Sequence, residues 1–124
     1  ARPLALEEAA QEFPSLRIVV AHFGWPWVEE ALLLALKYRN VYLDTSVVSS
    51  GTPRQALTRV LAAQVGLEVL ESSLPRQLLF GSNYPRVDIR RAARGLQALG
   101  LSPGLREAVA RGNAAELLGL KGRP

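Results

Sequence analysis

The feature that most constrains the fold is an alternation of strand-like and helix-like segments that occurs three times along the chain. Short apolar runs occupy residues 16–22, 41–46 and 77–83, and a helical pattern follows each of them. A continuous apolar run is typical of a strand covered on both faces by helices, as in a parallel sheet. The alternation therefore predicts an α/β fold whose parallel strands are joined by right-handed crossovers.

The helices are predicted from apolar spacing of three and four residues and from residues that favour helix ends. We expect one helix over 5–13 and another on the apolar positions of 28–36, closed by Asn40 in a left-handed cap. Further helices are predicted to begin at about Arg54, after the N-cap Asp88, at Ser102 with Pro103, and at Asn113, which has Glu116 three positions on.

The segments that follow the strands favour a barrel over an open nucleotide-binding sheet. No glycine-rich phosphate loop follows any of the three strands, whereas polar residues stand at the carboxyl end of each. A (β/α)8 barrel builds its active site at this end. We expect one domain, residues 1–124, made of about three of the eight strand-helix units of a TIM-like (β/α)8 barrel, and hence a partial barrel.

Four polar residues at the strand ends are candidates for a site. Side chains alternate along a strand, so His22 is predicted to share the face of Ile18. The same alternation gives Asp44 or Ser46 on the second strand and Asn83 on the third. If these faces point into a barrel, the side chains converge at one mouth. They could there hold a metal, orient a water or bind a polar substrate.

Each candidate also has a structural interpretation. A lone histidine that ends an apolar strand is more often a satisfied structural residue than a catalyst. Asp44 could cap a turn or bond the backbone just beyond it, and Asn83 could simply be a turn residue. Trp25 and Trp27 flank a proline; they could line a pocket, but core packing is the preferred interpretation.

Composition excludes several other classes of protein. The 124 residues include no cysteine, which removes disulfide frameworks and thiolate metal sites and fits a cytoplasmic location. No apolar run reaches the ~18–20 residues that a membrane span requires. Methionine is absent even from position 1, so we expect the chain to be a piece of a longer protein.

The net charge of +4 raises a nucleic-acid interpretation. Arg86, Arg90 and Arg94 recur every four residues, which predicts that they line one side of a helix. No lysine cluster and no run of aromatic residues accompanies them. A solvated helix face is therefore preferred to a phosphate-binding stripe.

The order of four segments resembles a known family. "LRIVVAHFGWP", "NVYLDTS", "LLFGSNYP" and "NAAELLGL" are similar, in order and spacing, to the C-terminal part of the metal-dependent amidohydrolases related to aminocarboxymuconate semialdehyde decarboxylase. The resemblance extends from about Leu4 to Leu120. It implies a (β/α)8 barrel, with these strands as the sixth to eighth. It also implies a divalent metal, commonly zinc, used for hydrolysis or non-oxidative decarboxylation.

The resemblance also implies roles for individual residues. His22 matches the family's active-site histidine, which orients the metal-bound water or the substrate, and Asn83 matches an aspartate that is normally a metal ligand and proton acceptor. A carboxamide binds metal weakly and accepts no proton at neutral pH. His22 is the only histidine, so the family's His-x-His pair is missing. The residues expected to face the substrate are Trp25, Asp44, Ser46 and Tyr84.

These features predict a fragment or truncated form of a metal-dependent hydrolase or decarboxylase that is inactive as an isolated chain. The family's cofactor would be a divalent metal, and this chain could bind none. The alternatives are a non-catalytic scaffold for self-assembly or partner binding and, with less support, a basic nucleic-acid-binding module. Expected partners are a small-molecule substrate in the full enzyme and either a second copy or the missing part of the barrel.

Overall fold

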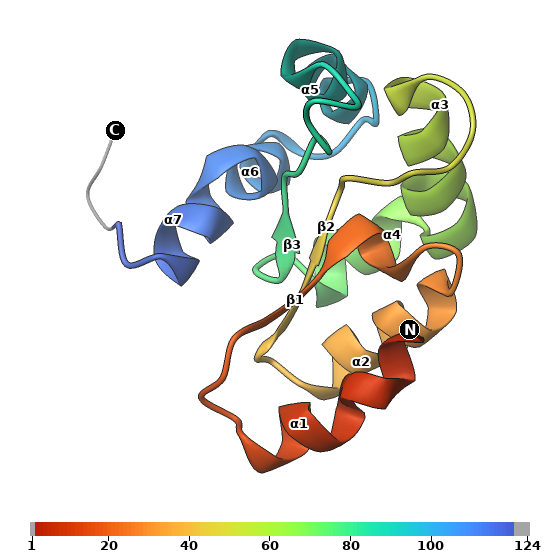
Figure 1. The fold of residues 1–124 in the computed structure, drawn as a ribbon. Helices are drawn as coiled ribbons and strands as arrows, with labels where there is room; N and C mark the ends of the chain where they lie inside the picture. Colours follow the sequence, from red (N-terminus) through yellow and green to blue (C-terminus); the bar gives the residue numbers. More distant parts are fainter. Residues whose placement is uncertain (1, 121–124) are drawn as a thin grey trace.

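The computed structural model describes residues 2–120. Its centre is an open sheet of three parallel strands in the order β1 (Ile18–Val20), β2 (Val41–Asp44) and β3 (Leu78–Leu79) (Figure 1). This confirms the predicted parallel α/β architecture. The strands are shorter than the runs that predicted them, since β1 ends at Val20, β2 at Asp44 and β3 at Leu79.

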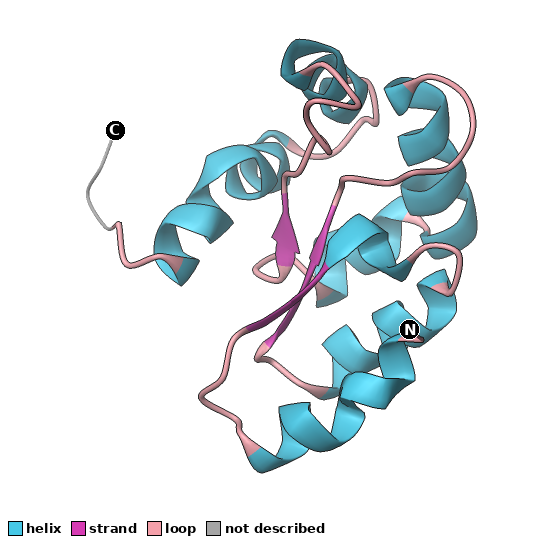
Figure 2. Cartoon of the chain, viewed as in Figure 1, coloured by secondary structure: helices cyan, strands magenta, loops and turns pink. Residues whose placement is uncertain are grey.

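Helical segments follow every strand, as the alternation predicts (Figure 2). In the view of Figure 1, α2, α3 and α4 lie to the right of the strands, and α6 and α7 lie to the left. In chain order the helical segments are the 3₁₀ segment Pro3–Leu6, α1 (Glu7–Glu12), the 3₁₀ segment Ala21–Gly24, α2 (Val28–Lys37), α3 (Pro53–Leu57), the π-helical segment Thr58–Val65, α4 (Leu67–Ser73), α5 (Ile89–Gln97), α6 (Pro103–Glu107), the π-helical segment Ala108–Gly112 and α7 (Asn113–Leu117).

Side-chain caps fix the beginnings of three helices. The side-chain oxygens of Thr52, Asp88 and Ser102 each accept a hydrogen bond from the backbone N–H three residues on, at 3.2, 3.3 and 3.2 Å. Such caps satisfy N–H groups that have no partner within the helix. The predicted N-caps Asp88 and Ser102 are therefore confirmed.

Two asparagines that were expected at helix ends connect distant segments instead. Asn113 lies inside a continuous helical stretch, with a helical φ of −67°, and its side-chain N–H groups donate to the carbonyl oxygens of Pro75 and Leu78 at 2.9 and 2.8 Å. Asn40 lies beyond the end of α2 and has no left-handed backbone. Its amide donates to the carbonyl oxygens of Ala10, Phe13 and Leu16.

The helical region that begins at α3 is interrupted. Gly66 takes a φ of 101°, a conformation that glycine adopts without steric cost. The chain then starts α4, which the sequence pattern did not predict as a separate helix. Leu70 of α4 is fully buried in the hydrophobic core, so the break allows a second apolar surface to pack inward.

The register of the strands shows which face of the sheet the core covers. Val20 pairs with Leu43, and both are buried in the core cluster. The next residue back, Val19, is 45% exposed and lies on the opposite face, as does Asp44. The alternation predicted for His22 is therefore wrong, because the residues two and four positions before it face the helices. The turn after β1, and not the alternation of the strand, sets the position of His22.

Candidate functional site

A left-handed turn after β1 positions His22. His22 and Phe23 have φ values of 61° and 52°, and Gly24 follows at 71°. Phe23 is completely buried, and a Cβ on Gly24 would lie 2.5 Å from the Cβ of Ala31. Burial of Phe23 and close packing of Gly24 on α2 hold the turn, which carries His22 towards the end of β2.

Asp44, the last residue of β2, connects this turn to the next loop. Its Oδ1 atom accepts hydrogen bonds from the backbone N–H of His22 at 2.9 Å, from the backbone N–H of Ser46 at 2.9 Å and from the Ser46 hydroxyl at 2.5 Å. Asp44 therefore does bond the backbone just beyond it, as the structural interpretation expected. It also binds the turn that carries the histidine.

The ring of His22 is held by the same loop. Its Nδ1 lies 2.6 Å from the carbonyl oxygen of Ser46 and 3.0 Å from the Ser46 hydroxyl, which itself donates to Asp44. A carbonyl oxygen can only accept, so Nδ1 carries the proton. In the neutral ring the lone pair is then on Nε2. That atom has no hydrogen-bond partner among residues 2–120 and is not buried.

The ends of β2 and β3 are joined by Thr45. Its hydroxyl oxygen accepts from the Gly81 N–H at 3.0 Å and donates to the Gly81 carbonyl at 3.1 Å. A Cβ on Gly81 would lie 3.2 Å from Asp44 and from Ser46 side-chain carbons, a tight contact from which these side chains would have to shift by a few tenths of an ångström. Sequence reasoning missed Thr45, although a hydroxyl directly after a strand is a recognisable feature.

Asn83 lines a different cavity from the one that His22 lines. It has a φ of 65°, a left-handed conformation that asparagine tolerates better than most residues. Asn83 and Ser46 both line a cavity of about 320 Å³. The structure describes no hydrogen bond between Asn83 and either His22 or Asp44, so the predicted convergence holds for His22, Asp44 and Ser46 and extends to Asn83 only through the cavity.

His22 faces a second cavity, of about 370 Å³, together with Trp25 and Trp27. Both tryptophan residues are 39% exposed, so the expectation that they pack in the core is wrong. The guanidinium of Arg2 lies over Trp27, 5.7 Å from the ring centroid, in cation–π geometry. Tyr84, the remaining predicted residue, is 68% exposed and lines neither cavity.

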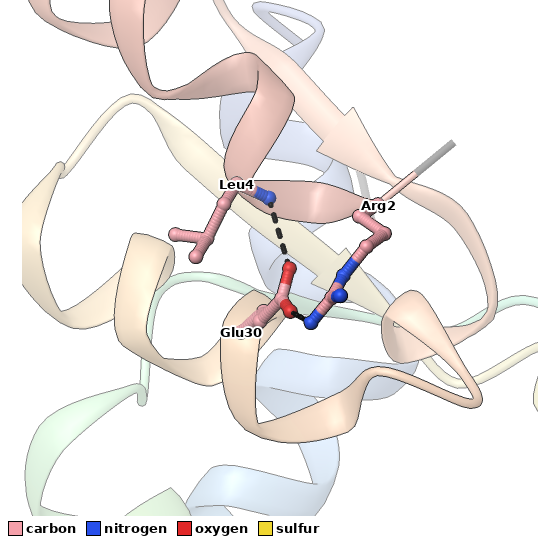
Figure 3. Close-up of polar contacts among 3 residues, drawn as sticks. All are labelled: Arg2, Leu4 and Glu30. Atoms are coloured by element: carbon pink, nitrogen blue, oxygen red, sulfur yellow. Dashed lines mark hydrogen bonds and ion pairs between the residues drawn. The ribbon is translucent and has the colours of Figure 1, made fainter.

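The N-terminal segment closes one side of this second cavity. The carboxylate of Glu30 on α2 accepts hydrogen bonds from the Arg2 guanidinium and from the backbone N–H of Leu4, the latter at 3.4 Å (Figure 3). The hydrogen bond from Arg2 is the main cause that lowers the pKa of Glu30 below its ordinary value of 4.5. The ionised carboxylate therefore anchors this segment.

The residues of the site do not fit a complete zinc centre. Structural and catalytic zinc sites take about three or four protein ligands. Within residues 2–120 no group of three or more histidine, cysteine, aspartate or glutamate side chains could hold a metal ion. Asp44 already uses Oδ1 for three hydrogen bonds, and Asn83 offers a neutral amide.

Comparison with known proteins assigns this arrangement to a class and then to a family. The three parallel strands match part of a TIM barrel: an uncharacterized TIM-barrel protein of Bordetella bronchiseptica (Bb4693) is 28% identical, with a TM-score of 0.76. The alignment covers 98% of this chain and 40% of that one. The sequence profile of the amidohydrolase family matches residues 1–120. The chain belongs to the amidohydrolase family.

A search of curated proteins gave no match. Among residues 2–120, none of the helices has the length and apolar character needed to cross a lipid bilayer. Amidohydrolases typically depend on a metal ion, and among residues 2–120 no group of three or more histidine, cysteine, aspartate or glutamate side chains could hold one.

Proposed function

We propose that this chain supplies the segment that carries the active-site residue His22 in a cytoplasmic metal-dependent hydrolase or decarboxylase barrel, and that it has no such activity by itself. The divalent metal, zinc in this proposal, would require ligands beyond those of this chain. The substrate would be a small molecule bound at the carboxyl ends of the strands.

One observation carries this proposal. The Ser46 carbonyl holds the proton on Nδ1 of His22, at 2.6 Å, and leaves Nε2 accessible. A histidine whose tautomer and orientation are fixed in this way is ready to accept a proton or a hydrogen bond from a substrate or water. A purely structural histidine would make the same contact between Nδ1 and the Ser46 carbonyl, for stability alone. The test must therefore remove Nε2 and keep the contact with Ser46.

The substitution His22→Asn makes that separation. Asparagine tolerates the left-handed backbone and retains an amide N–H that can donate to the Ser46 carbonyl, but it has no counterpart of Nε2. The assay compares the isolated chain, supplied with zinc, with the chain joined to a segment that carries a His-x-His pair. We expect no turnover from the isolated chain. In the joined protein, His22→Asn should lower kcat by about 100-fold or more, the usual scale of acid–base catalysis. Turnover by the isolated chain, or full activity of the variant, would reject the proposal.

A non-catalytic scaffold is the second candidate function. The observation that favours it is the edge of β1, which within the described part of the chain pairs only with β2, while Val19 on this strand is 45% exposed. An unpaired strand edge beside exposed apolar side chains is suited to pairing with another chain. If the chain is a scaffold, it should pair with another chain, and the protein joined to the His-x-His segment should show no turnover.

A further inference from the structure

An arginine precedes each of the three strands. Arg17 stands directly before β1, Arg39 stands two positions before β2, and Arg76 stands two positions before β3. The strands are parallel neighbours in one sheet, so the three arginines gather at the amino ends of the strands. His22 follows β1 at the opposite, carboxyl end. The proposed active site therefore does not use this group of positive charges.

A small cavity lies at the amino ends of the strands. Arg39 and Arg76 line it, as do two residues of α7, Glu116 and Leu117. Arg17 is not a lining residue, but its guanidinium donates to the carbonyl oxygen of Leu117 at 2.7 Å. Three guanidinium groups are thus associated with this cavity, and among its described lining residues Glu116 carries the only carboxylate.

The guanidinium groups of Arg39 and Arg76 are not used by the fold. Within residues 2–120 the structure describes no hydrogen bond, ion pair or ring contact for either group, and both residues are exposed. Basic side chains near the end of a helix often bind its last carbonyl groups. At the end of α2 the side-chain amide of Gln77 does so instead. It donates to the carbonyl oxygens of Ala35, Tyr38 and Val41 at 2.6, 3.1 and 2.8 Å. The five N–H donors of each arginine therefore remain available to a ligand.

The size and charge of the cavity limit what it can bind. Its volume of about 110 Å³ is well below the roughly 300–1,000 Å³ of small-molecule sites, and a single water takes roughly 30 Å³. A single oxyanion group fits, and the body of any larger ligand would lie outside. Three guanidinium groups against one carboxylate leave two positive charges, which balance a phosphate group of about −1.5 to −2 charges.

We propose that Arg17, Arg39 and Arg76 bind a phosphate group at the amino ends of the strands, either as inorganic phosphate or as the phosphate of a small monoester. A guanidinium bonds two phosphate oxygens at once through its planar pair of donors. The carboxylate of Glu116 opposes the bound anion. This site lies at the other end of the strands from His22, so the inference goes beyond the proposed function and does not rest on it.

The test titrates the ¹⁵N-labelled chain with inorganic phosphate and with methyl phosphate, at neutral pH and constant ionic strength. Binding is followed through the backbone signals of Gln77 and Leu117, which line the cavity. We expect saturable shifts, and acetate, which carries one charge, should bind at least about tenfold more weakly. Equal binding of both phosphates would identify the phosphate of a larger molecule as the ligand. Binding of inorganic phosphate alone would identify the free ion.

Substitutions assign the binding to these side chains. Arg76→Gln should weaken phosphate binding by about tenfold or more, because it removes a charged partner. The matched control is Arg90→Gln, which removes the same charge from an exposed position on α5 outside the cavity and should change binding by less than about twofold. Glu116→Gln removes the opposing carboxylate and should tighten binding by about twofold or more. A variant that merely folds poorly would not bind more tightly.

Four outcomes would overturn this inference. The first three are absence of saturable shifts with phosphate, binding of acetate as tight as that of phosphate, and equal weakening by Arg76→Gln and Arg90→Gln. The fourth is a single-stranded oligonucleotide that binds more tightly than phosphate and loses affinity equally in both arginine variants, since this would show general attraction of nucleic acid to a basic surface. None of these outcomes bears on the His22→Asn experiment, so the two proposals fail separately.

Discussion

The Nδ1 atom of His22 lies 2.6 Å from the carbonyl oxygen of Ser46, a residue 24 positions later in the chain. This contact links the turn after β1 to the loop after β2. Asp44 closes the link, because one of its carboxylate oxygens accepts from the backbone N–H groups of both residues. The histidine is therefore held by Asp44, the last residue of β2, and by Ser46 in the loop that follows it.

The first prediction concerns Asp44. Asp44→Ala removes the acceptor of three hydrogen bonds, and hydrogen bonds to charged groups contribute roughly 1.5–3 kcal/mol each with incomplete additivity, so the free energy of unfolding should fall by about 2–4 kcal/mol. Urea denaturation measures this change. Glu12→Ala is the control, since Glu12 is exposed, and it should change stability by no more than about 0.5 kcal/mol. An Asp44→Ala effect as small as the control would show that the network is not structural.

The architecture could be predicted from the sequence because the local sequence patterns agree with the way the strands and helices pack. The strand-helix alternation gives the parallel sheet, and Asp88 and Ser102 cap their helices through bonds three residues away. Such features depend on neighbours in the chain, and a single sequence contains them.

The details of the site depend on contacts between distant residues. The alternation of a strand could not place His22, because the strand ends at Val20 and the burial of Phe23 sets a left-handed turn. Asn113 looks like an N-cap but bonds to carbonyl groups about 35 positions earlier in the chain. In the same way, Arg86 fits a helical spacing but precedes the helix.

The second prediction concerns metal binding by the isolated chain. We expect calorimetry to detect no stoichiometric zinc site of submicromolar affinity, because such sites need about three or four ligands and the described residues provide no cluster of three. Asn83→Asp should not create one, since it adds a single carboxylate, and it should leave the fold intact because aspartate also tolerates a left-handed backbone. A stoichiometric submicromolar site in either protein would contradict this prediction.

The third prediction is a dependence of stability on pH through Glu71. Its carboxylate accepts from the backbone N–H and from the hydroxyl of Ser102, both at 2.7 Å, and these bonds lower the pKa of Glu71 below its ordinary value of 4.5. A lowered pKa means that the carboxylate stabilises the fold above the ordinary pKa and that this contribution is lost as the pH falls through the lower, folded value. Glu71→Gln should therefore lower stability at neutral pH and have less effect in acid.

Thermal unfolding of the parent chain and of Glu71→Gln, from neutral pH into acid, measures the difference in their stability. Glu68→Gln is the matched control, because Glu68 is an exposed residue of the same helix, and its difference from the parent chain should not vary in this way. A constant difference between the parent chain and Glu71→Gln from neutral pH into acid would rule out the proposed linkage.

The last prediction concerns association through the edge of β1. Among residues 2–120 this strand pairs only with β2, and its exposed Val19 lies on the face of the sheet that the core does not cover. Unpaired edges and contiguous apolar surface promote pairing with another chain. We expect light scattering at micromolar concentration to show a dimer or a larger species. Its interface should exceed the roughly 1,000 Å² typical of specific contacts.

Substitution separates this interface from general hydrophobic association. Val19→Lys adds a charge to the strand and should shift the population towards monomer, since lysine on an edge strand opposes further pairing. Leu33→Lys is the control: Leu33 is 47% exposed, against 45% for Val19, but it lies on α2. The control should retain the parent's assembly. If both variants dissociate equally, the association comes from exposed apolar area in general. A parent chain that is a stable monomer with a cooperative unfolding transition would mean that the open edge requires no partner, and the scaffold function would then lose the observation that supports it.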